Sequence, residues 1–262
     1  MEFRVRGGEV RVGCADAPQL LAEVAARLGD GRGFRIATLN VDHLQKLDHD
    51  PAFRAAYAAH DLVVADGNPV VWLARLAGER LSLAPGSELV EPLCRAAAQA
   101  GVPVALVAGS QPAAEGAARS LAARIPGLRF NLLTAPGTPF DPASAEADAL
   151  IAAIDASGAR LCLLGFGAPR QERFAARAGE ALPGVGFASV GAGLDFLAGL
   201  QTRAPAAVRK ARLEWLWRAA SSPRRLGPRY LRGFAILPGH ALNALHRRLR
   251  NRTADRGQRP AE

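Results

Sequence analysis

Apolar residues along the chain alternate between short continuous runs and segments with helical spacing. The runs LVV, VALVA and LCLL, within 62–65, 104–108 and 160–164, indicate strands. Continuous apolar runs are typical of strands that are covered on both faces. Segments such as 17–28 and 88–100 place apolar residues three and four positions apart, as helices do. We therefore expect an α/β fold with a mostly parallel, Rossmann-like sheet flanked by helices.

The remaining expected elements continue this alternation. Further strands are expected at 35–39, 128–133 and 186–190. Further helices are expected at 43–47, 51–59, 70–76, 113–124, 142–156 and 169–178. Residues 1–12 alternate apolar and polar positions on either side of Gly7-Gly8, which predicts a short hairpin.

Small and polar residues follow most of the expected strands. Ligands of parallel α/β sheets bind beside the carboxyl ends of the strands, where small residues let backbone N–H groups approach a phosphate. The residues at these ends are Thr38, Asn40, Asp66, Gly67, Gly109, Ser110, Gly165, Gly167, Gly191 and Gly193. The pattern therefore predicts a cleft that holds a nucleotide.

Several polar residues near these strand ends allow both a functional and a structural interpretation. Asp66 can act as a base if the strand end desolvates its carboxylate, or it can form a turn with Gly67. Thr38 and Asn40 can hydrogen-bond a sugar or a phosphate, or cap the following helix. Asp195 can accept a hydrogen bond from a ligand hydroxyl, or cap a helix. Both interpretations stay open at each position.

The segment 165–172, GFGAPRQE, joins a strand to a helix. It is neither a GxGxxG dinucleotide motif nor a phosphate loop, because it lacks GK[ST]. Gln171 and Glu172 fall in the first helical turn, within reach of the predicted cleft. Alternatively, Pro169 begins the helix and the charge of Glu172 stabilises its positive end.

Composition excludes several classes of protein. Hydrophobic residues make up 49% and charged residues 22%, as in globular proteins. The cysteines Cys14, Cys94 and Cys162 form no CxxC pair and are expected to be buried and reduced. The histidines show no metal-binding spacing, so no structural zinc ion is expected. We also expect no signal peptide and no segment that spans a bilayer.

Positive charge is concentrated at the end of the chain. Residues 203–262 contain fifteen Lys or Arg and three Asp or Glu, a net charge of +12, whereas residues 1–202 carry −3. This asymmetry predicts an anionic partner for the basic segment, and apolar residues between its arginines suit a membrane surface. We therefore predict a catalytic domain over 1–202 and a basic helical appendage over 203–262, broken by prolines and glycines and disordered in its last residues.

Six segments in order carry a resemblance to a known family. They are TLNVDH, VVADGNPVVW, PGSELV, GFGAPRQE, VGAGLDFLAG and RAP…RLEWLWR, and the resemblance covers roughly residues 35–235. In this series the chain resembles the WecG/TagA/CpsF glycosyltransferases (glycosyltransferase family 26).

The resemblance implies an inverting, metal-independent hexosyltransferase of cell-envelope polysaccharide synthesis. The implied donor is UDP-N-acetylmannosamine, and the implied acceptor is a sugar linked to polyprenyl diphosphate. The implied location is the cytoplasmic face of the plasma membrane, with peripheral attachment. Self-association into a homo-oligomer is left open, and nucleic acid is not expected as a partner.

The resemblance also implies roles for individual residues. Asp66 matches the family's proposed general base, and Thr38 is placed with it in the catalytic centre. The implied substrate-binding residues are Asn40, Gly67, Gln171, Glu172, Gly191, Gly193 and Asp195. The implied contacts to the lipid diphosphate and the membrane are Arg218, Arg224, Arg225 and Arg229.

Alternatives remain both for the transferred sugar and for the class of protein. Leu83 stands where the family usually has an arginine, and Glu88 where it has an aspartate, so a hexose such as glucose remains open as the transferred sugar. A nucleic-acid-binding protein would use the basic tail, although no helix-turn-helix, RRM or zinc-finger pattern is present. A nicotinamide-dependent oxidoreductase would use the Rossmann-like core, although GxGxxG is absent.

Overall fold

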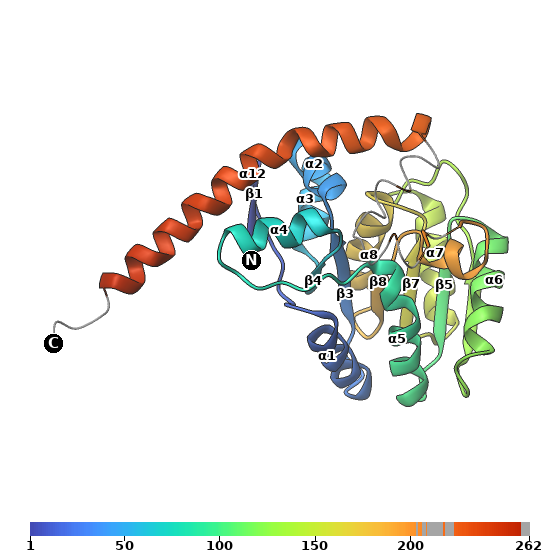
Figure 1. Ribbon diagram of the computed structural model, residues 1–262. Helices are drawn as coiled ribbons and strands as arrows, with labels where there is room; N and C mark the ends of the chain where they lie inside the picture. Colours follow the sequence, from blue (N-terminus) through green and yellow to red (C-terminus); the bar gives the residue numbers. More distant parts are fainter. Residues whose placement is uncertain (203, 206–207, 209–216, 218–222, 258–262) are drawn as a thin grey trace.

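The computed structural model of the protein, drawn in Figure 1, describes residues 1–202, 204–205, 208, 217 and 223–257. Within 223–232 and 252–257 it describes the backbone and not the side chains. Within the appendage expected to be helical, residues 203, 206–207, 209–216, 218–222 and 258–262 therefore lie outside the described residues.

Strands and helices alternate along the first 202 residues, as expected. The strands are β1 (Glu2–Val5), β2 (Gly8–Arg11), β3 (Phe34–Leu39), β4 (Leu62–Ala65), β5 (Val104–Ala108), β6 (Phe130–Thr134), β7 (Leu161–Gly165) and β8 (Gly186–Ser189). The helices are α1 (Ala17–Gly29), α2 (Val41–His49), α3 (Pro51–Ala58), α4 (Asn68–Leu76), α5 (Gly86–Gln99), α6 (Gln111–Ala122), α7 (Ala145–Ala156), α8 (Arg170–Ala181) and α9 (Gly193–Leu197). Each expected strand and helix of this region is present, and α9 is an addition that the sequence pattern did not predict.

Six strands form one parallel sheet in the order β4-β3-β8-β7-β5-β6. The chain runs outward from β3 to β4, crosses to β5 and β6 on the other side, and then fills the centre with β7 and β8. The predicted Rossmann-like α/β fold is thus confirmed. Strands β1 and β2 form the separate antiparallel hairpin, with Val5 opposite Gly8 across a turn at Arg6-Gly7.

Both faces of the sheet are buried, which explains the continuous apolar runs. In β5, Val104, Leu106 and Ala108 pack into a core with α1, α5, α6 and α9. The alternate residues Ala105 and Val107 pack into the opposite core with α7 and α8. Since neighbouring residues of a strand point to opposite faces, a strand covered twice must be apolar throughout.

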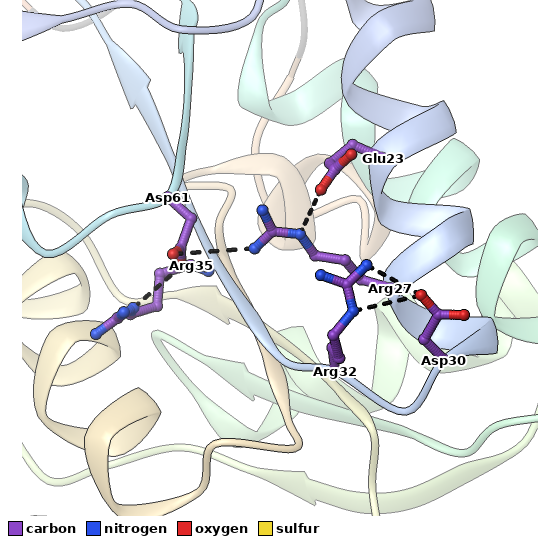
Figure 2. Close-up of polar contacts among 6 residues, drawn as sticks. All are labelled: Glu23, Arg27, Asp30, Arg32, Arg35 and Asp61. Carbon is purple, nitrogen blue, oxygen red and sulfur yellow. Dashed lines mark hydrogen bonds and ion pairs between the residues drawn. The ribbon is translucent and has the colours of Figure 1, made fainter.

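Ion pairs link α1 to the amino ends of the sheet strands, opposite their carboxyl ends (Figure 2). The carboxylate of Asp61, just before β4, accepts hydrogen bonds from the backbone N–H of Arg35 at 2.9 Å and from its Nε at 3.3 Å. Arg27 of α1 lies 3.9 Å from the same carboxylate and bonds Glu23 at 2.6 Å. This cluster ties α1 to the starts of β3 and β4.

A single helix, α12 (Pro223–Gly257), forms the end of the described chain and crosses the top of the molecule in Figure 1. It contacts α2, α4 and β1. Ile236, Leu237 and Ala241 pack against the core formed by β1–β4 and α2–α4. Arg247 adds ion pairs to Glu2 at 2.6 Å and to Glu79 at 3.3 Å.

Helix α12 is continuous from Pro223 to Gly257, so the expectation that prolines and glycines break the basic appendage is wrong over this range. Buried or half-buried residues recur with helical spacing on both sides of Pro238, from Gly233 through Ile236 and His240 to Ala244. Pro238 and Gly239 lie on the exposed side. Burial of this stripe therefore outweighs the low helix propensity of the two residues. The helix also includes 254–257, near the end of the chain where disorder was expected, and 258–262 lie outside the described residues.

Two glycines of α12 provide a matched test of its docking on α2. A Cβ at Gly233 would lie 2.9 Å from Cγ1 of Val41, whereas a Cβ at Gly239 would meet nothing within 4 Å. We expect Gly239→Ala to stabilise the protein by up to about 1 kcal/mol through helix propensity. We expect Gly233→Ala to destabilise it by about 1–3 kcal/mol through overpacking. Urea unfolding followed by circular dichroism measures both, and equal effects of the two substitutions would contradict the docking.

Candidate active site

A cavity of about 530 Å³ lies at the carboxyl edge of the parallel sheet. Residues that end or follow five strands line it: Asn40 after β3, Asp66 and Gly67 after β4, Gly109 after β5, Gly165 in β7 and Gly191 after β8. The prediction that the cleft lies beside these strand ends is therefore confirmed. Gly233 and Phe234 of α12 also line the cavity, so the C-terminal helix forms part of its wall.

The centre of the site is the pair Asn40 and Asp66. Parallel pairing of β3 with β4 sets Leu39 beside Ala65, so the next residue of each strand emerges next to the other. Asn40 Nδ2 donates to Asp66 Oδ2 at 3.4 Å, while Asn40 Oδ1 accepts from the backbone N–H of His43 and caps α2. Asn40 thus serves both as the cap and as a neighbour of the cavity carboxylate.

Thr38 and Asp195 complete the predicted polar lining. Thr38 is buried in β3, and its methyl group would lie 3.3 Å from a Cβ placed on Gly86. Asp195 lies in α9, where its Oδ2 accepts a hydrogen bond from Gln201 Nε2 at 2.7 Å. The N-cap of α9 is Ala192, so Asp195 is not the cap of that helix.

The loop before α8 is held by Gln171, which lines the cavity although it is almost fully buried. Gln171 Oε1 accepts from the backbone N–H of Gly167 at 3.1 Å. Gly167 has φ +89°, a conformation that favours glycine. The side chain therefore fixes the turn that brings the β7–α8 loop beside the cavity.

Glu172 lies behind the cavity wall rather than in it. Its side chain is fully buried, and its Oε1 accepts from Gln171 Nε2 at 2.7 Å. Burial raises the pKa of Glu172 to about 7, although the Gln171 bond and Lys46 act in the other direction. Glu172 lies in the first turn of α8, whose N-cap residue Pro169 makes no side-chain capping bond. Its place near the positive end of α8 agrees with the structural interpretation, whereas direct contact with a ligand in the cavity does not fit this buried position.

Gly193 is also outside the cavity lining. A Cβ at this position would lie 2.8 Å from Cγ2 of Val90 and 3.0 Å from the Cα of Ser87. Gly193 thus serves the close packing of α9 on α5. Of the predicted tail arginines, Arg218 lies outside the described residues; Arg224, Arg225 and Arg229 lie on α12, with side chains that the structure does not describe.

The cavity wall contains an ion pair that was not predicted from the sequence. Lys46 Nζ donates to Asp42 Oδ2 at 2.6 Å and to the carbonyl oxygen of Ala168 at 3.2 Å. Asp42 and Lys46 are four residues apart on α2, a spacing that brings side chains together and could have revealed the pair. Through Ala168, this pair joins α2 to the loop before α8.

Charge in the cavity is predominantly negative. Among the lining residues that the structure describes, Asp42, Asp66 and Asp195 carry carboxylates, and Lys46 is the only lysine or arginine. His43 is buried in the wall, where its Nδ1 lies 3.1 Å from the Tyr57 hydroxyl. A polyanionic ligand would therefore need cations from beyond these residues.

Metal-binding clusters and membrane-spanning helices are both absent from the part of the chain that the structure describes. Among the described residues, no group of three or more His, Cys, Asp or Glu side chains is arranged to hold a metal ion. The described helices include none that is long and apolar enough to cross a membrane. The three cysteines are buried and unpaired with one another, as expected.

The fold and the cavity define a Rossmann-like α/β protein with a cavity at the carboxyl edge of the sheet, where ligands of such folds bind. The family model of the WecG/TagA/CpsF glycosyl transferases matches residues 5–254. The chain belongs to this family, and it is a glycosyltransferase of cell-surface polysaccharide synthesis.

The buried carboxyl of Glu172 predicts a specific dependence of stability on pH. Because its pKa rises from 4.5 to about 7 on folding, the folded protein retains a proton that the unfolded chain has lost between these values. Stability conferred by the neutral form is thus lost as pH rises through 7. Glu172→Gln, which stays neutral, should be more stable than the wild type by about 2–4 kcal/mol at pH 8. The difference should vanish below pH 4.5.

Urea unfolding at pH 4 and pH 8 measures this effect. Glu180→Gln is the matched control, because Glu180 is an exposed glutamate of the same helix. It should change stability by less than about 0.5 kcal/mol at either pH. A Glu172→Gln protein less stable than the wild type at pH 8 would contradict the account.

Proposed function

We propose that the protein transfers N-acetylmannosamine from UDP-N-acetylmannosamine, with inversion, to a sugar linked to polyprenyl diphosphate. The observation that carries this proposal is the carboxylate of Asp66 in the cavity at the strand ends, hydrogen-bonded by Asn40. Family membership supports sugar transfer, and the donor and acceptor are our inference from the resemblance and the site.

Asp66 acts as the general base of the proposed reaction. Its carboxylate takes the proton of the acceptor hydroxyl while that oxygen bonds to the anomeric carbon of the donor. The bond from the anomeric carbon to the diphosphate oxygen breaks on the opposite face, and UDP leaves. Asn40 holds one carboxylate oxygen of Asp66, and Thr38 lies in the same wall.

The departing UDP needs positive charge that the described cavity wall supplies only through Lys46. We assign the remaining charge to the basic appendage, in particular to Arg218, Arg224, Arg225 and Arg229. The last three precede Gly233 and Phe234 on α12, and these two residues line the cavity. With arginines in this role, the reaction proceeds without a metal ion.

A hexose donor is the second candidate, and one observation favours it. Leu83, at the position where an arginine is usual, lines the cavity. Its side chain offers no hydrogen bond to a sugar substituent. Glu88, which replaces the aspartate usual in the family, is exposed and does not line the cavity. This replacement therefore has no direct bearing on the donor.

The role of Asp66 is tested with the isosteric substitution Asp66→Asn. We expect kcat to fall about 10²- to 10⁴-fold, because the amide cannot accept the hydroxyl proton, while UDP binding stays within a few-fold of the wild type. UDP release measures kcat, and calorimetry measures binding. Asp16→Asn is the control, since Asp16 caps α1 and asparagine caps equally well. Turnover near the wild-type level would remove Asp66 from this role.

We further propose that α12 attaches the protein peripherally to the cytoplasmic face of the plasma membrane. Leu242, Leu245 and Leu249 recur at helical spacing and are 61%, 42% and 59% exposed. Arg248 and Arg250 lie on the same turns. Such a face, apolar with flanking arginines, inserts into the interface of anionic bilayers.

Sedimentation with anionic vesicles tests this attachment. Replacing Leu242, Leu245 and Leu249 together by glutamine should weaken binding at least about tenfold, because apolar burial in the bilayer is lost. The same triple replacement by methionine keeps the apolar face and should bind like the wild type. Equal vesicle binding by the glutamine and methionine variants would contradict the role of this face.

A further inference from the structure

Gln171 links the cavity to Glu172, a buried acid that the proposed reaction does not use. Gln171 lines the cavity, whereas Glu172 is fully buried beneath it. Oε1 of Glu172 accepts from Gln171 Nε2, and its Oε2 has no hydrogen-bond partner among the described residues. A buried carboxyl oxygen without a partner is costly, so its retention calls for an explanation.

Glu172 determines which way the amide of Gln171 faces. A carboxylate can only accept, so it selects the NH₂ end of the amide. The carbonyl end then accepts from the N–H of Gly167, as observed. The bond to Glu172 fixes the NH₂ group of the Gln171 amide, and the bond from Gly167 fixes its carbonyl oxygen. Either bond alone would leave the amide freer to rotate.

A count of hydrogen-bonding groups shows what Gln171 can offer a ligand. Its NH₂ group has two hydrogens, and Glu172 accepts one of them. With the carbonyl oxygen engaged by Gly167, the second N–H is the hydrogen-bond donor that this side chain retains for the cavity. Its acceptor would be an oxygen of a ligand, which suits a sugar or a diphosphate.

We propose that Glu172 is a positioning residue, which orients Gln171 so that its second amide N–H donates to an oxygen of the bound nucleotide-sugar donor. This inference rests on the proposed function of the cavity as a donor site. Glu172 acts on the donor through Gln171 and does not touch it.

The charge of Glu172 sets how firmly Gln171 is held. An ionised carboxylate accepts a stronger hydrogen bond than a neutral one. The charged and titratable groups that influence Glu172 or respond to it are Asp42 and Lys46 of α2 and Tyr57 of α3. Lys46 favours the ionised form and Asp42 opposes it. Because burial raises the pKa of Glu172 to about 7, donor binding should strengthen between pH 6 and pH 8.

Calorimetric titration with UDP-N-acetylmannosamine at pH 6 and pH 8 tests the proposal. Both phosphates of this probe are diesters, so the probe itself does not titrate in this range. Glu172→Gln mimics the neutral acid in size and shape. At pH 8 it should bind the probe about 3- to 10-fold more weakly than the wild type, the equivalent of one weakened hydrogen bond. At pH 6 the two proteins should bind nearly equally.

A double-mutant cycle separates positioning from a general structural effect. Gln171→Ala should weaken binding, and adding Glu172→Gln to it should cause no further loss, because Glu172 acts through Gln171. The exposed control Glu180→Gln should bind like the wild type at both pH values. A variant that is more stable than the wild type at pH 8 and still binds the probe less well cannot be explained by misfolding.

The outcomes distinguish this inference from the function on which it rests. A wild-type protein that binds neither UDP-N-acetylmannosamine nor UDP would contradict the proposed function. A wild type that binds the probe as well as Glu172→Gln does at both pH values would overturn the positioning role alone. Additive losses in the double variant would overturn it too.

Discussion

The register between β3 and β4 is the constraint on which the site depends. Leu39 pairs with Ala65, and the N–H of Asp66 donates to the carbonyl oxygen of Leu39 at 2.8 Å. Asn40 and Asp66 therefore leave the sheet side by side, which allows their contact. A shift of one residue would turn one of these side chains to the opposite face. The apolar residues that bury both faces of the sheet hold this register in place.

Charge is divided between the parts of the molecule that form the cavity. The first 202 residues carry −3 and the last sixty carry +12, and the cavity wall described here contains three carboxylates beside Lys46. The C-terminal helix docks on α2 and α4, and its Ile236, Leu237 and Ala241 pack against the core there. A base needs an unneutralised carboxylate, whereas a leaving diphosphate needs cations. Both requirements are met in our proposal by assigning the cations to the basic appendage, whose helix α12 lines the cavity through Gly233 and Phe234.

Local pattern predicted most of the fold, and tertiary packing accounts for what it missed. The runs LVVA and VALVA became β4 and β5 at the expected residues, because strands buried on both faces must be apolar. The continuous α12 was missed because Pro238 and Gly239 are poor helix formers, and only the stripe buried against the body holds them in a helix. The cavity was placed correctly from the strand ends. The complete burial of Glu172 was not predicted, because nothing in the sequence distinguishes a buried carboxylate in a first helical turn from an exposed one.

The central claim is that this cavity transfers a sugar from UDP to a lipid-linked acceptor. Its most direct test measures UDP release by the full-length protein with UDP-N-acetylmannosamine and a short-chain prenyl-diphosphate-linked N-acetylglucosamine. The assay contains EDTA to remove metal ions. We expect UDP release that requires the acceptor and continues in EDTA. An absence of acceptor-dependent release with this donor and with other UDP-sugars, in the presence or absence of metal ions, would contradict it.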